Sequence, residues 1–142
     1  HGGFHQHYGQ TNTLRNHIFA FGRDHQIQRT RAEGHRSFSF VTNLVYFDSG
    51  KLLDGSWSDD KFKMDWNAYF DTRTATNDKA ILFAGMPLQQ CQARGNDTNS
   101  VIADPHFVAP NQNDFRLGLN TPAFQLGFHP IDLRNVGVRK LK

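Results

Sequence analysis

Cysteine is almost absent from this sequence, since its 142 residues contain only Cys91. A single thiol excludes an internal disulfide and a cysteine-rich zinc site, and it leaves the cellular compartment open. Long apolar runs are also missing. The stretch "AILFAGM" is far shorter than the roughly 20 apolar residues of a membrane-spanning helix, so we expect no membrane partner.

Runs of basic residues and helical periodicity are lacking as well. The net charge of +3 and the pI near 9.3 come from scattered residues, and no run of Lys or Arg exceeds the tail "VRKLK", so nucleic acid is not an expected partner. No stretch keeps apolar residues at helical spacing over three turns. The 13 Phe and 12 Gly instead favour a folded, turn-rich chain, and the length fits one all-β domain.

A repeat centred on asparagine is the strongest signal. The segments "LRNHIFAF", "VTNLVYFD" and "DWNAYFDT" place Asn16, Asn43 and Asn67 at intervals of 27 and 24 residues, each followed by apolar and aromatic residues. Such intervals suit the stacked coils of a solenoid. We therefore predict short parallel strands about 4.8 Å apart, with the three asparagines hydrogen-bonded in a ladder at one corner.

The regularity of the chain decreases after about residue 72. We predict regular coils over residues 1–72 and an irregular coil with an excursion over residues 73–100. Residues 101–142 contain Pro105, Pro110 and Pro122 and form a predicted C-terminal cap, which covers the last edge of the stack.

Four closing motifs carry a resemblance to a known family. They are Asp104-Pro105-His106-Phe107, Asp114-Phe115-Arg116-Leu117, Thr121-Pro122-Ala123 and Gly127-Phe128, followed by "PIDLRNVG". With the asparagine repeats and the opening "GGFHQHYGQTNTLRNHIFAF", they resemble the C-terminal part of right-handed parallel β-helix proteins of the pectin-lyase-like superfamily, in particular bacterial secreted members that act on polysaccharides.

The resemblance implies a location outside the cytoplasm, secreted or periplasmic, and a polysaccharide or oligosaccharide as ligand. Glycoside hydrolysis is the leading reaction, and the alternatives are a polysaccharide lyase and a non-catalytic glycan-binding or structural solenoid. It also implies that coils precede residue 1. An open coil end exposes a sheet edge and apolar interior, so we expect it to be covered by upstream coils, another chain or self-association.

Alignment on the asparagines suggests a surface groove. Ten and eight residues before them lie two columns, Gln6, Glu33 and Trp57, and Tyr8, His35 and Asp59. Glycoside cleavage needs two carboxylates about 5 Å apart for retention or about 6.5–9.5 Å apart for inversion. Glu33 with Asp59 is the leading catalytic pair, and Asp24 with Asp65 is the reserve.

The remaining groove residues are predicted to bind substrate, and they are His5, His7, Tyr8, Arg31, His35 and Trp57. In a lyase, Arg29, Arg31 or His35 would abstract the proton and a calcium ion would assist, although no acidic cluster suggests one. For the leading function no cofactor is expected. The metal alternative is a copper or zinc site formed by His1, His5 and His7.

Overall fold

The computed structural model describes residues 2–75, 80–134 and 136. In these residues the secondary structure consists of twelve strands, three short 3-10 helices and one α-helix, α1 (Leu88–Ala93). The predicted all-β class is confirmed. None of the described helices is long and apolar enough to cross a membrane.

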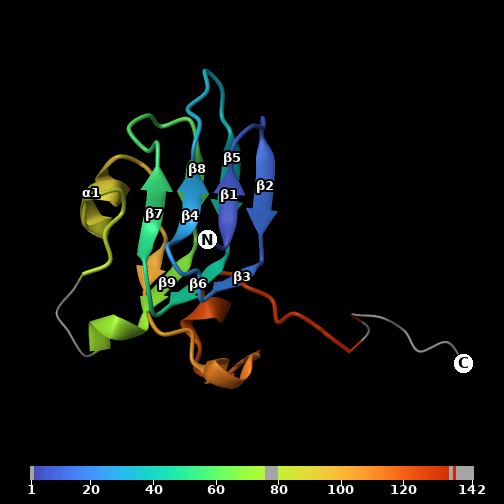
Figure 1. Ribbon diagram of the computed structural model, residues 1–142. Coiled ribbons are helices and arrows are strands. Elements are labelled where there is room, and N and C mark those ends of the chain that lie inside the picture. Colours follow the sequence, from blue (N-terminus) through green and yellow to red (C-terminus); the bar gives the residue numbers. More distant parts are fainter. Residues whose placement is uncertain (1, 76–79, 135, 137–142) are drawn as a thin grey trace, which may run out of the picture.

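Ten strands form three parallel sheets (Figure 1). The first sheet contains β1 (Phe4–Gln6), β4 (His25–Arg29) and β7 (Lys51–Gly55). The second contains β2 (Asn12–Arg15), β5 (Phe38–Val41) and β8 (Lys63–Asp65). The third has the order β3 (Ile18–Ala20), β6 (Leu44–Phe47), β9 (Ala68–Asp71) and β10 (Val101–Ile102). The chain thus visits the three sheets in turn and returns to the first, and we term each such passage a circuit.

The interior is filled by side chains from all three sheets. Ile27, Phe38, Phe40, Val45 and Tyr69 are at most 1% exposed and belong to one apolar cluster. Strand residues alternate between the two faces of a sheet, and parallel strands in register place similar residues above one another. Aromatic and β-branched residues therefore stack along the axis, as the repeat predicted.

The asparagine ladder is partly right and needs a correction at its first member. Asn67 Oδ1 accepts the Asn43 backbone N–H at 2.9 Å across 24 residues. Asn43 Oδ1, however, accepts the N–H of His17 at 2.9 Å across 26 residues, so the 27-residue alignment on Asn16 is one residue out of register. Asn16 instead lies at the preceding corner, where Asn16, Thr42 and Trp66 all have left-handed backbone, with φ of 59°, 55° and 58°.

The two later parts of the chain cover the stack at different places. Residues 80–100, with α1, pack Ile81, Phe83 and Cys91 into the main core at the far end from β2 (Figure 1). The antiparallel pair β11 (Phe107–Ala109) and β12 (Asp114–Leu117) and the segment up to Phe128 lie on the outward side of the third sheet. The remaining 3-10 helices are η1 (Thr72–Ala75), η2 (Pro110–Gln112) and η3 (Pro122–Phe124).

Candidate functional site

The outward face of the first sheet carries a row of polar side chains. His5, Gln28 and Asp54 are in register on β1, β4 and β7. Neighbouring strands lie about 4.8 Å apart, so the three side chains form a short polar row across the sheet. Gln28 Nε2 donates to Asp54 Oδ2 at 2.7 Å.

Asp54, the acid of this row, contacts two basic side chains. Lys51 Nζ lies 2.6 Å from its Oδ1, and His25 Nδ1 lies 3.8 Å from its Oδ2. The hydrogen bond from Lys51, followed by that from Gln28, lowers the pKa of the Asp54 carboxyl below its ordinary value. Asp54 is therefore an ionised carboxylate at neutral pH, held in position by the first sheet.

Two histidines share one hydroxyl at the β1 end of the row. His5 Nε2 and His7 Nδ1 each lie 2.9 Å from Thr30 Oγ1. All three residues are exposed. Each imidazole has a second nitrogen, for which no hydrogen bond is seen among the described residues, so both rings can meet hydroxyl groups of a ligand.

A second group of predicted residues continues from His7. The rings of His7 and Tyr8 meet edge to face at 4.5 Å, and the Arg31 guanidinium lies 4.4 Å from the Tyr8 ring centre. Arg31 Nη1 donates to Tyr8 Oη at 2.7 Å. Glu33 completes the group, with Arg31 Nε at 3.7 Å and His35 Nε2 at 3.2 Å.

The structure therefore brings together six of the predicted site residues. They are His5, His7, Tyr8, Arg31, Glu33 and His35. We term these six residues, together with Gln28, Thr30, Lys51 and Asp54, the first-sheet patch.

Asp59 and Arg29 do not belong to this patch. Arg29 is fully buried, and its Nη1 donates to Asp59 Oδ1 at 2.8 Å and to the Ser56 carbonyl at 2.9 Å. A buried arginine needs such partners. Asp59 is thus occupied by a structural ion pair, and the assignment of Arg29 as a lyase base is wrong because no substrate can reach it.

Trp57 is also misplaced by the sequence alignment. It is 6% exposed, packs against Phe38 and Phe62 and donates from Nε1 to the Asp54 carbonyl at 2.8 Å. The predicted role as a surface ring is wrong. The first predicted column, Gln6, Glu33 and Trp57, is also wrong, because Gln6 is in register with Arg29 and not with Glu33.

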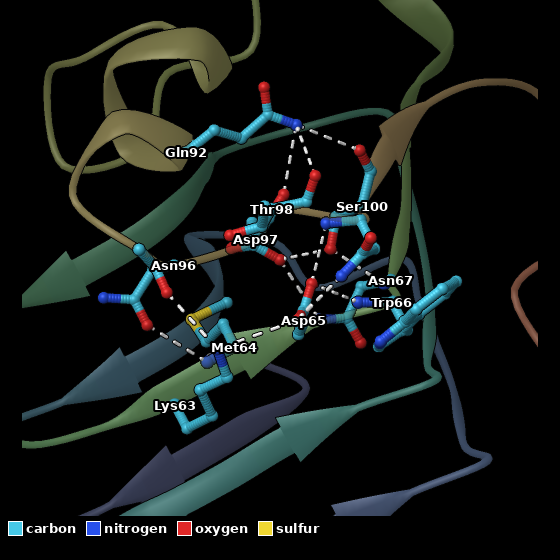
Figure 2. Close-up of polar contacts among 12 residues, drawn as sticks. Lys63, Met64, Asp65, Trp66, Asn67, Gln92, Asn96, Asp97, Thr98 and Ser100 are labelled. Atoms are coloured by element: carbon cyan, nitrogen blue, oxygen red, sulfur yellow. Dashed lines mark hydrogen bonds and ion pairs between the residues drawn. The ribbon is translucent and has the colours of Figure 1, made fainter.

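The reserve pair is Asp24, which lies outside the strands, and Asp65, which lies on the second sheet. Asp24 precedes β4, where its carbonyl accepts the Lys51 N–H at 3.2 Å. Asp65 ends β8 and is 7% exposed. Its Oδ1 accepts the N–H group of Trp66 (Figure 2) and also that of Asn99. Asp65 therefore holds the corner of the second sheet and is unsuited to a paired catalytic role.

The metal alternative lacks a complete donor set in the part of the chain that can be judged. His1 lies outside the described residues. Within residues 2–75, 80–134 and 136, no three His, Cys, Asp or Glu side chains come together in a way that could hold a metal ion. His5 and His7 instead use one nitrogen each on Thr30.

An open cavity of about 660 Å³ adjoins the patch at β7. Its lining includes Lys51, Asp54, Ser56, Ser58 and Arg94. Charged and hydroxyl side chains on β7 and beside it can hydrogen-bond a ligand rich in hydroxyl or carboxylate groups. The arrangement therefore provides a polar binding surface that extends from Tyr8 to Arg94.

Gln28, Thr30, Lys51 and Asp54 were missed by the sequence alignment. Their signal is the spacing of the first sheet, which differs from that of the asparagines: His7 and Thr30 are 23 residues apart, whereas Gln28 and Asp54 are 26 apart. Comparisons with known proteins found no matching family model, no matching curated protein and no matching solved structure.

Proposed function

We propose that this chain is part of a secreted or periplasmic protein with a right-handed parallel β-helix of the pectin-lyase-like type, and that the first-sheet patch binds a polysaccharide. The observation that supports it best is the continuous set of accessible polar groups that runs from Tyr8 and His7, just after β1, through His5 on β1 to Asp54 on β7. Sheet-borne donors and acceptors are held in position before a glycan binds, which reduces the entropic cost of binding.

Arginine, lysine and histidine side chains along this surface can pair with a sugar chain that carries carboxylate groups. Arg31, Lys51 and Arg94 contribute cations along the surface, and three of its members, His5, His7 and His35, gain charge when protonated. The acids Glu33, Asp54 and Asp60 are paired with Arg31, Lys51 and Arg94, respectively, and a carboxylate of the ligand would compete for these cations. Uronic-acid polysaccharides are therefore the first ligand class to test.

Binding is tested by calorimetric titration of the chain with neutral and uronic-acid oligosaccharides. Arg31→Ala removes a charged donor, and we expect about 10- to 100-fold weaker binding. The matched control is Arg116→Ala on β12, where an exposed arginine is paired with Asp114 away from the patch. Equal binding by the Arg31 and Arg116 variants would contradict the proposal.

Glycoside hydrolysis is the second candidate function. Its carboxylates are Glu33, whose side chain is only 13% exposed, and Asp54, which is kept ionised by Lys51. Different environments for two acids are what acid and base roles require. Asp54 takes the place of Asp59, which is bound to Arg29.

Product analysis separates the candidate reactions. New reducing ends that disappear in both Glu33→Gln and Asp54→Asn would support hydrolysis. Unsaturated uronate products that depend on Arg31 or His35 would support a lyase. Binding without products supports the glycan-binding function alone.

A further inference from the structure

The end of the stack formed by β1, β2 and β3 differs from the interior in burial. Phe4, Leu14 and Phe19 are only partly buried although they pack against the main core. Their register partners in the second circuit are Ile27, Phe40 and Val45, which are at most 1% exposed. The first circuit thus presents the same apolar columns without a covering layer.

An unpartnered amide lies at the same end. Gln6 is 3% exposed, and neither Oε1 nor Nε2 has a hydrogen-bond partner among the described residues. Its register partner Arg29 bonds to groups of the following circuit, Ser56 and Asp59. A buried amide without partners is costly, so this position suits a polar contact from a neighbouring circuit.

The C-terminal segment runs back along the third sheet towards this end. The outward column Val101, Ala68, Leu44 and Ile18 extends from the fourth circuit to the first. Ala123, Leu126 and Phe128 cover its middle part. At the first circuit His129 exchanges two hydrogen bonds with the Asn16 side chain, at 2.7 and 2.9 Å.

Beyond His129 the segment leaves the body of the protein. Figure 1 shows it running past β2 and β3 along the stacking direction. Its apolar residues Ile131, Leu133 and Val136 are 45%, 67% and 70% exposed. Ile131 and Leu133 line an open hollow of about 620 Å³ together with Ile18 and Leu117.

We propose that β1, β2 and β3, together with residues 129–134, form a docking surface for further circuits of parallel strands that precede β1 in the same polypeptide. The outward apolar column of the third sheet then continues onto the added circuits. The outward apolar residues of those circuits pack under Ile131 and Leu133. A second copy stacked head to tail is disfavoured, because residues 80–100 cover the opposite end of the stack.

The chain itself supplies a probe. Lys51, which follows Gly50, is the strand partner of His25. Gly2 likewise lies opposite His25, because Phe4 is the strand partner of Ile27 two residues further on. A copy of residues 25–50 placed directly before Gly2 therefore continues the register. The control carries the same 26 residues in scrambled order.

The readout is trypsin cleavage after Arg134, followed by mass spectrometry, beside circular dichroism and light scattering. We expect added strand content and cleavage at least about tenfold slower in the extended chain than in the scrambled control, because packing restricts local opening. Ile131→Asp with Leu133→Asp in the extended chain should restore fast cleavage. Leu119→Asp, at a residue 95% exposed outside the segment, should not.

Three outcomes would overturn the proposal. The first is an added circuit that gains no strand content over the scrambled control. The second is a folded added circuit with unchanged cleavage after Arg134. The third is a dimer of the original chain in which residue 134 is already protected, because a second copy would then be the occupant.

Discussion

At the scale of single residues, the largest departures from the sequence analysis are polar or aromatic side chains that the solenoid buries. Arg29 and Trp57 alternate with exposed residues in ways that fit a surface groove, yet both point into the core. Arg29 is stabilised there by Asp59, Ser37 and the Ser56 carbonyl. Residue type alone does not show that a buried partner exists, since that partner comes from another circuit.

Asp97 is a further buried acid, and it has a consequence for stability. Its Oδ1 accepts hydrogen bonds from Ser100 and Asn67 (Figure 2) and from the Tyr69 hydroxyl. Burial nevertheless raises the pKa of Asp97 above its ordinary value of 3.8. Between the unfolded pKa and this raised folded pKa, the folded protein binds more protons, so its stability falls as pH rises through that window.

We expect Asp97→Asn to remove this dependence. The free energy of unfolding of the wild type, minus that of Asp97→Asn, should decrease as pH rises from 3.8 through the raised pKa and stay level above it. Urea titrations of both proteins over a pH series measure the difference. Asp114→Asn is a control of opposite sign, because Arg116 lowers the pKa of Asp114 to about 2, so Asp114 loses its contribution only as pH falls below 3.8. A pH-independent difference for Asp97→Asn would contradict the argument.

At the scale of strands and corners, the sequence predicts the period well but not the register. Asparagines with following aromatics correctly indicate short stacked parallel strands. Asn16 misleads because asparagine serves two purposes in this fold, a left-handed corner at position 16 and a buried ladder at positions 43 and 67. The sequence analysis identified patch residues within 5–8 and 31–35, whose contacts join the first and second circuits. It missed Asp54, because it used the asparagine intervals of 27 and 24 residues, whereas Gln28 and Asp54 on the first sheet are 26 apart.

The ladder makes a prediction that separates these two purposes. Asn67 is fully buried, and its amide bonds to the Asn43 N–H, the Phe40 carbonyl and Asp97. Asn67→Ala removes all three bonds and deprives the buried Asn43 N–H of this acceptor, and we expect a loss of about 3 kcal/mol or more in the free energy of unfolding. Chemical denaturation followed by circular dichroism measures it.

Asn16→Ala is the matched comparison. It loses the two bonds to His129 and places alanine at a φ of 59°, for which we expect a loss of about 1–2 kcal/mol. If Asn16→Ala proved as costly as Asn67→Ala, the corrected register would be wrong.

At the scale of the whole molecule, one stack combines two different outward faces. The third sheet is covered by the chain up to Phe128, while the first sheet is left open and carries the polar patch. The covering layer therefore contributes to stability without occupying the surface proposed to bind glycans. Strand partners lie 23 or more residues apart throughout the stack, so every circuit depends on contacts that are distant in sequence.

Phe128 tests this division of roles. It is 2% exposed and packs with Leu44, Ala68 and Leu126 on the outward side of the third sheet. Phe128→Ala should lower the free energy of unfolding by about 3–5 kcal/mol, because it leaves a cavity in that layer. Phe124→Ala, at a residue 43% exposed in the same segment, should cost less than about 1 kcal/mol.

At temperatures where both variants remain folded, the affinity for an oligosaccharide ligand should match that of the wild type, since neither residue belongs to the first sheet. A loss of affinity in folded Phe128→Ala would show that the two faces are coupled and that the covering layer also shapes the binding surface.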